Sequence, residues 1–215
     1  MHMKTIVRNC AIGAALIGIG AASTLALQQP EVGSTPPPMP DFSKVTKKDL
    51  GMMMEQMHGP AEEHKALEPL IGKSKLESSL NVGPGVPPIV GHYEGSAEWI
   101  LGKRFVQVRT VPAPGEEFKA ESLSIYGYDT RVKKYFWIGI DTMGTYSVTA
   151  FGDYNAAKKQ FTLMGENEEP GMGKIPFRNV ITVKDDGTLE SMIDFKMQGT
   201  EDWMNVATMK WSKVK

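Results

Sequence analysis

Cysteine is almost missing from this 215-residue chain, since the single one is Cys10, close to the N-terminus. Beyond Cys10 the sequence can form no disulfide, no thiol nucleophile and no thiolate metal site. Histidine is also rare, and His58, His64 and His92 do not have the spacing of the three or four close ligands of a zinc site. We therefore expect no metal and no cofactor, and a stability that comes from an ordinary hydrophobic core.

An excess of positive charge is missing as well. The chain has a formal net charge of −1, and its first 26 residues contain Lys4 and Arg8 but no acidic residue, so the remainder carries −3. A surface without a basic excess attracts neither the phosphates of nucleic acids nor anionic lipid. Nucleic acid is therefore not an expected partner.

The sequence has one long uncharged apolar run, at residues 10–27, which follows Lys4 and Arg8. This order is typical of a secretory signal peptide, and the small residues Thr24 and Ala26 favour cleavage after Ala26, with Ala21 and Ser23 as a nearly equal alternative. Residues 1–26 would then be removed and the protein exported to the periplasm or the extracellular space. An uncleaved membrane anchor is the alternative, but interior glycines and modest hydrophobicity favour cleavage, after which no membrane insertion is expected.

Two further regions follow the leader. Residues 27–45 contain five prolines and few large apolar residues, which predicts an extended linker. Residues 46–215 are expected to form a domain that begins with two short helices. Thr46 and Asp49 form a capping-box pattern at the start of the first helix, which we predict at 47–57.

The predicted first helix has one apolar face, made of Leu50, Met53, Met54 and Met57. Thioethers next to a histidine could bind Cu(I), but we interpret these methionines as packing residues because they share the face that Leu50 defines. Pro60 is placed to start a second helix, which should end before Pro69.

From Leu70 the sequence changes to short runs of β-branched and aromatic residues between turn-forming clusters. The clusters lie at 81–88, 112–116, 129–134, 141–144, 153–158, 165–173, 185–187 and 199–202. This spacing predicts a mainly β fold, an up-and-down antiparallel meander of about nine or ten strands. So many strands favour a closed β-barrel, which has no exposed edges, over the alternative of a two-sheet sandwich.

Two of these runs alternate with the period of two that a strand requires. One face of 135–141 carries Phe136, Ile138 and Ile140, and one face of 189–195 carries Leu189, Ile193 and Phe195. Apolar faces of strands normally form the core. We therefore predict that both sets face the interior. In the tripeptide 127–129, Asp129 is interpreted as the cap of a tight turn, and Tyr126 or Tyr128 as a residue that packs across the hairpin.

Several motifs occur in a characteristic order along the chain. They are Gly-Pro-Ala-Glu-Glu-His at 59–64, Leu-Glu-Pro-Leu-Ile-Gly at 67–72, Trp-Ile-Leu-Gly-Lys-Arg-Phe at 99–105, Gly-Tyr-Asp at 127–129, Asp-Thr-Met-Gly at 141–144 and Trp-Ser-Lys at 211–213. In this order they resemble an uncharacterised bacterial family of exported proteins, domain of unknown function 1579, over residues 56–213. The resemblance implies a lipocalin-like barrel and no agreed activity.

The chain departs from this family at the start of the first strand. Relatives usually carry a tryptophan there, at the base of the barrel, whereas here Gly72 is followed by Lys73 and Ser74. Another tryptophan would have to fill that space. The candidates are Trp99, Trp137, Trp203 and Trp211.

Aromatic residues are spread over several of the predicted strands, and some must face inward if the sheet closes. The candidates for a ligand-binding site are Trp99, Tyr135, Phe136, Trp137, Tyr146, Phe151 and Trp203. No serine lies in a Gly-x-Ser-x-Gly motif and no catalytic residue is assigned. Glu98 and Asp141 lie in or beside strands and are the candidates for an acid or base if the protein is an enzyme.

These residues leave three functional hypotheses. We favour a non-enzymatic module that binds a small apolar or aromatic ligand in the barrel. The second hypothesis is an enzyme that acts on a small molecule in the same pocket. The third is a structural or partner-binding envelope protein, tethered by the proline-rich linker. The oligomeric state does not follow from the sequence.

Overall fold

The computed structural model describes residues 45–214 except 84, 170–172 and 197–198. The leader, its predicted cleavage and nearly all of the predicted linker lie outside these residues. The chain divides into two compact units between Gly59 and Pro60. In the described part of the chain, no helix is long and apolar enough to cross a membrane.

Helix α2, Lys47–His58, belongs to the first unit and confirms the helix predicted at 47–57. Its capping box is formed: Asp49 N donates to Thr46 Oγ1 (3.1 Å), and Thr46 N donates to Asp49 Oδ2 (3.0 Å). Hydrogen bonds from Thr46 lower the pKa of Asp49, and the bond from its side chain contributes more than the bond from its backbone. No residue of α2 is buried, so the packing role predicted for its methionines is not observed.

The second predicted helix is present in the second unit as the 3₁₀ helix η3, Glu62–Leu70. The expectation that it ends before Pro69 is wrong. In a 3₁₀ helix the last turn is closed by i to i+3 bonds, and Ile71 N donates to Glu68 O (3.1 Å) past the proline. At its start, Ala61 N donates to His64 Nδ1 (3.0 Å), so this buried histidine caps the helix.

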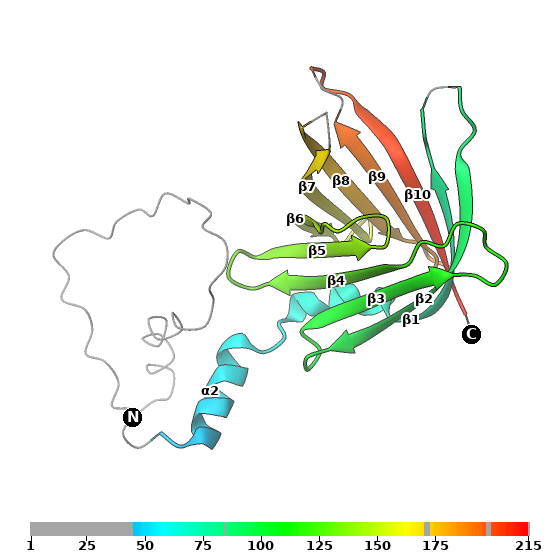
Figure 1. The fold of residues 1–215 in the computed structure, drawn as a ribbon. Helices are drawn as coiled ribbons and strands as arrows, with labels where there is room; N and C mark the ends of the chain where they lie inside the picture. The colour runs from blue at the N-terminus through cyan, green and yellow to red at the C-terminus, as the bar shows by residue number, and fades with distance from the viewer. Residues whose placement is uncertain (1–44, 84, 170–172, 197–198, 215) are drawn as a thin grey trace. The chain divides into compact units, whose positions relative to one another are not determined.

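Ten strands follow η3 and make up the rest of the second unit. They are β1 (Gly72–Leu80), β2 (Ile89–Ile100), β3 (Phe105–Pro112), β4 (Ser122–Asp129), β5 (Lys134–Asp141), β6 (Val148–Asn155), β7 (Gln160–Glu169), β8 (Gly173–Val183), β9 (Leu189–Lys196) and β10 (Trp203–Lys213). Each strand pairs antiparallel with its neighbours in sequence, and β1 also pairs with β10. The predicted closed up-and-down barrel is therefore confirmed, and the sandwich is excluded (Figure 1).

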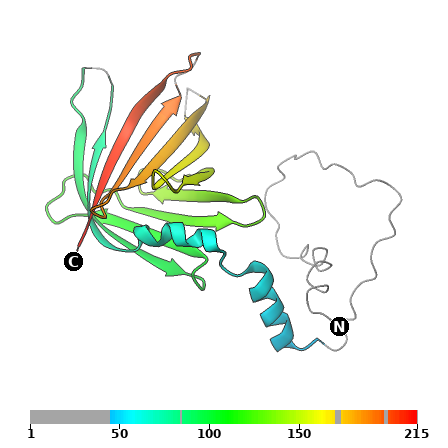
Figure 2. The same cartoon turned by 180° about the vertical axis from the view of Figure 1, so that it is seen from behind.

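We call the end of the barrel at which β1 starts the base, and the opposite end the mouth. The base is closed by η3, drawn in cyan in Figure 2, whose Leu67 and Leu70 join the buried core. Tyr135 Oη donates to Glu63 O (2.8 Å), and Lys213 Nζ donates to Leu70 O (3.0 Å). Apolar contact and these two bonds fix η3 to the strands, so the barrel is plugged at one end.

The core lies inside the barrel toward the base. Its buried members include Val106, Ala150, Phe161, Leu163 and Phe177, each at most 2% exposed. Leu189 also belongs to it, and Phe195 packs against it. The prediction that this face of β9 points inward is therefore confirmed.

The corresponding prediction for β5 is wrong. Tyr135, Trp137 and Gly139 face the interior, whereas Ile138 is 38% exposed and lies on the outer face with Phe136. Ile140, 45% exposed at the end of the strand, borders the cavity at its mouth. The inner face carries glycine because a Cβ at Gly139 would lie 2.7 Å from Trp137 Cζ2. The indole ring of Trp137 covers the position of that side chain. The inner face is therefore apolar at residue 139, although the sequence has glycine there.

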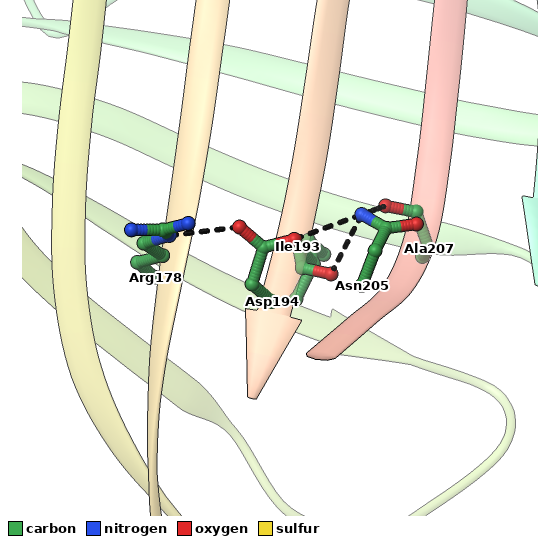
Figure 3. Close-up of polar contacts among 5 residues, drawn as sticks. All are labelled: Arg178, Ile193, Asp194, Asn205 and Ala207. Carbon is green, nitrogen blue, oxygen red and sulfur yellow. Dashed lines mark hydrogen bonds and ion pairs between the residues drawn. The ribbon is translucent and has the colours of Figure 1, made fainter. Parts of the chain in front are cut away.

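A polar cluster on the outer face joins β8, β9 and β10, as Figure 3 shows. Asp194 Oδ2 accepts from Arg178 Nε (2.7 Å), and Asp194 Oδ1 accepts from Asn205 Nδ2 (2.9 Å). The strand register shifts between Asn205 and Ala207, and Asn205 Nδ2 also donates to Ala207 O (3.2 Å). The guanidinium of Arg178 lies 4.6 Å from the ring centre of Trp203. The cluster therefore secures a β-bulge, a feature that needs added contacts because the ladder is interrupted there.

Candidate functional site

The barrel is hollow between its core and its mouth. The cavity has a volume of about 250 Å³ and is lined by η3, by β1 to β6 and by β8 to β10. Two of its exposed lining residues, Phe118 and Met143, lie in the loops at the mouth. Ligand pockets typically measure roughly 300–1,000 Å³, so this cavity is suited to one small molecule.

One wall of the cavity is aromatic. Trp137 from β5 and Tyr126 from β4 are cross-strand partners whose rings stack, with centroids 6.5 Å apart. Trp137 Nε1 donates to Ser124 Oγ (2.9 Å), so the indole is held in one orientation. Burial raises the pKa of Tyr126 far above its ordinary value, and the hydrogen bond with Ser124 offsets only part of this shift. The wall is therefore rigid and uncharged.

Trp211 from β10 supplies a second ring to the lining. A Cβ at Gly95, on β2, would lie 3.0 Å from Trp211 Cζ3, so this ring, like that of Trp137, rests over a glycine. Glycine at these positions lets a large ring lie along the wall instead of projecting across the lumen. This arrangement keeps the lumen open although the barrel has only ten strands.

Small polar side chains line the cavity between the apolar ones. Thr110 Oγ1 and Ser122 Oγ share a hydrogen bond between β3 and β4. Ser191 Oγ on β9 donates to Asn179 Oδ1 on β8 (2.7 Å). Burial, and to a lesser extent Glu116, raises the pKa of Tyr93, which also lines the cavity. The lumen is thus apolar with hydrogen-bonding groups at defined points, which is the usual composition of a ligand pocket.

Two carboxylates stand at the mouth, on neighbouring strand ends. Asp141 Oδ1 accepts from Met143 N (2.8 Å) in the loop after β5. Glu121 Oε2 accepts from Arg109 Nη2 (3.0 Å), an ion pair in which both side chains are about half exposed. Both carboxylates therefore already have structural partners. Among the described residues, no group of three or more His, Asp or Glu side chains is placed to hold a metal ion.

Two of the candidates predicted from the sequence, Trp137 and Asp141, line this cavity. Trp99 and Tyr135 also point into the barrel, but they pack against the core and do not line the cavity. Trp99 lies on β2 opposite Val106 and supplies a tryptophan close to the base, where the resemblance led us to look for one. Its Nε1 is buried and has no hydrogen-bond partner among the described residues.

The remaining candidates lie outside the cavity. Phe136 and Phe151 contact each other on the outer face, with ring centroids 6.1 Å apart. Tyr146 is 57% exposed in the loop between β5 and β6, and Trp203 lies under Arg178 on the outer face. Glu98 is exposed on β2, on the face opposite to that of Trp99. The inward-facing aromatics could not be separated from these by residue type alone.

The structural interpretation of the tripeptide 127–129 is confirmed. Asp129 Oδ1 accepts from Arg131 N (2.9 Å), and the bidentate pair with the Arg131 side chain lowers the pKa of Asp129. Tyr128 packs on Tyr135 across the hairpin, with ring centroids 4.9 Å apart. These residues stabilise the base of the barrel and do not form a site.

The polar residues of the lumen were missed by the sequence reasoning. Ser122, Ser124, Asn179 and Ser191 are small polar residues in strands, where serine is normally interpreted as facing solvent. A signal existed in β1, where Ser74, Leu76, Ser78 and Leu80 occupy alternate positions and all line the cavity. Alternation between serine and leucine on one face is the pattern of a wall that is neither core nor surface.

Comparison with known proteins gives the fold and the family. The crystal structure of Rv2717c from M. tuberculosis is similar, with a TM-score of 0.54 and 13% sequence identity, over 72% of this chain and 99% of that chain. At this identity the likeness concerns the fold alone. A search of curated proteins returned no match. The family model described as protein of unknown function (DUF1579) matches residues 59–213, so the chain belongs to the DUF1579 family, as the motifs of its sequence indicate.

Proposed function

We propose that this protein is a non-enzymatic binding module that holds one small, mainly apolar ligand in the lumen of its barrel. The observation that carries the proposal is the cavity of about 250 Å³, which has aromatic walls and opens at one end of a barrel that η3 closes at the other. An apolar molecule that enters the cavity is removed from contact with water. This burial stabilises the complex by roughly 25 cal/mol per Å² of buried apolar area.

An enzymatic role receives less support from the geometry. A general acid or base has to reach the substrate with a free proton-accepting or proton-donating atom. Asp141 and Glu121 are the carboxylates that line the cavity, and both stand at its mouth with partners in neighbouring loops and strands. Glu98 points away from the lumen. Binding therefore explains the arrangement better than catalysis.

The proposal includes the location of binding. The leader predicted at residues 1–26 would export the protein, and the ligand would then be met in the periplasm or outside the cell. A net charge of −3 for the remainder supports a small neutral ligand rather than nucleic acid as the partner.

The test uses N-phenyl-1-naphthylamine, an uncharged dye whose emission rises in a dry apolar site. We expect saturable binding to the wild-type protein and its loss in Ala97→Phe, because Ala97 lines the cavity and the added ring would fill it. Met209→Trp fills the same lumen from β10 and serves if the first variant does not fold. Ile138→Phe, which places the same ring on the outer face, is the matched control and should bind normally. Equal binding by all folded variants would show that the dye does not occupy the lumen.

A further inference from the structure

The cavity contains no positively charged side chain. Its ionisable lining groups are Glu121 and Asp141 at the mouth and the neutral Tyr93 and Tyr126, and no lysine, arginine or histidine is among the described lining residues. Cations on the flanking strands are engaged elsewhere: Arg109 pairs with Glu121 at the mouth, Arg178 reaches Asp194 on the outer face, and Lys213 donates to Leu70 O at the base. A carboxylate that entered the lumen would lose its hydration without gaining an ion pair.

A hydrogen-bond donor does point into the cavity. Asn179 is 2% exposed and lines the lumen, and its Oδ1 is occupied by the hydroxyl of Ser191 (2.7 Å). Among the described residues, its Nδ2 donates no hydrogen bond, and Nδ2 is not one of the fully enclosed polar atoms without a partner, so it borders the open space of the lumen. The two N–H groups of this buried amide therefore have no protein partner, and a buried donor without an acceptor is normally supplied with one by water or a ligand.

The position of Asn179 suits a ligand that enters from the mouth. Asn179 lies on β8, and its cross-strand partner on β9 is Ile193, two residues after Ser191. Ile181, two residues further along β8, also lines the cavity, so apolar side chains flank the amide. Trp137 of the aromatic wall packs edge-on against Phe177, with centroids 6.2 Å apart, so its ring reaches β8, the strand that carries Asn179. A flat or short aliphatic body can rest against this wall while one polar atom reaches the amide.

We propose that the natural ligand is an uncharged molecule with an apolar or aromatic body and one carbonyl or similar oxygen that accepts a hydrogen bond from Asn179 Nδ2. This inference rests on the proposed function, because it names the class of ligand that the same lumen takes. It excludes free fatty acids and other carboxylates, which need a cation that the lining does not offer. Asn179 and Ser191 together act as the polar end of an otherwise apolar pocket.

Three probes of nearly equal size separate these properties. Acetophenone has a ring and a carbonyl oxygen, ethylbenzene has the ring without an acceptor, and benzoate has the ring with a negative charge. Binding is measured by titration calorimetry on the intact protein. We expect acetophenone to bind roughly three- to tenfold more tightly than ethylbenzene, the range of one net hydrogen bond. Benzoate should bind more weakly than either.

Variants of Asn179 connect the preference to this side chain. In Asn179→Leu, of similar volume, the affinity for acetophenone should fall to that for ethylbenzene, whose own affinity stays within about twofold. In Asn179→Asp the donor is replaced by an acceptor in the same position, and acetophenone should lose its advantage there too. Met192→Leu, on the outer face of β9 beside Ser191, is the control that should leave all three affinities unchanged.

The outcomes distinguish a failure of the role assigned to Asn179 from a failure of the proposed binding function. If ethylbenzene binds the wild-type protein as tightly as acetophenone, or benzoate binds more tightly, the assignment of Asn179 is overturned and the binding function stands. An acetophenone preference that persists in both Asn179 variants also overturns it. If none of the three probes binds the folded wild-type protein, the proposed function itself is contradicted.

Discussion

The polar cluster on the outer face permits a prediction of magnitude. Asp194 is 6% exposed and accepts from Arg178 and Asn205, and Asp194→Ala removes both bonds. A hydrogen bond to a charged group contributes ~1.5–3 kcal/mol, which sets an upper bound of ~6 kcal/mol for the pair. Both donors keep other partners, however. The Arg178 side chain is 36% exposed and rests on Trp203, and Asn205 Nδ2 still reaches Ala207 O.

We therefore expect Asp194→Ala to lower the free energy of unfolding by ~2–3 kcal/mol. This is less than the ~3–5 kcal/mol that follows when one partner of a buried ion pair is left uncompensated. Urea unfolding followed by circular dichroism would measure it. Arg178→Met keeps the apolar stem over Trp203, and a double-mutant cycle with Asp194→Ala should give a coupling energy of ~1 kcal/mol. A coupling energy near zero would refute the view that the two residues act as a pair.

Three further predictions concern the interior. Leu163 is 1% exposed, and Leu163→Ala should lower the free energy of unfolding by ~2–5 kcal/mol. Ile138 is 38% exposed, and Ile138→Ala should lower it clearly less. Equal losses in urea unfolding would contradict the outward orientation of Ile138 on β5. Gly139→Ala should push the Trp137 ring into the lumen, lower stability by ~1–3 kcal/mol and weaken dye binding, and an unchanged dye affinity would count against this packing. Burial raises the pKa of Tyr135 to about 12, and a group whose pKa is raised on folding adds stability that is lost as the pH rises from its ordinary value of 10 toward 12. Tyr135→Phe should therefore show a smaller loss of stability than the wild-type protein between pH 9 and 11, while parallel curves would refute this contribution.

The architecture could be predicted because local signals agreed over the whole domain. Clusters of turn residues separated the strands, and a closed barrel follows when about ten strands share one antiparallel meander. The cluster at 165–173 was misleading at one end, because β7 continues to Glu169. Gly165 lies within the strand, where a Cβ would be 2.3 Å from Thr149 O, so it is there for close strand packing and not for a turn.

The face of β5 could not be predicted for a related reason. Both of its faces are apolar, and alternation of Phe136, Ile138 and Ile140 competes with alternation of Tyr135, Trp137 and Gly139. Hydrophobicity favours the first set. The interior accepts the second because Tyr135 finds an acceptor in Glu63 O and Trp137 finds one in Ser124 Oγ. These partners come from η3 and β4, and the sequence of β5 contains no information about them.

Asn179, the polar residue on which the proposed ligand class depends, could not be predicted from the sequence for a similar reason. Asn179 is identified by its 2% exposure and by its bond to Ser191 on the adjacent strand, and neither is visible in a single sequence. Trp137 and Asp141 were found because aromatic and acidic residues in strands were considered as classes. Which members of a class converge on one lumen depends on strand register, which only the closed barrel determines.

The central claim, that a ligand occupies the lumen, can be tested with the four tryptophans of the chain. Trp137 and Trp211 line the cavity, Trp99 lies in the core below it, and Trp203 lies on the outer face. In protein labelled with 5-fluorotryptophan, ¹⁹F NMR resolves one resonance for each. On titration with acetophenone we predict shifts of the Trp137 and Trp211 resonances and an unchanged Trp203 resonance. A shift of Trp203 with Trp137 and Trp211 unmoved would contradict the account.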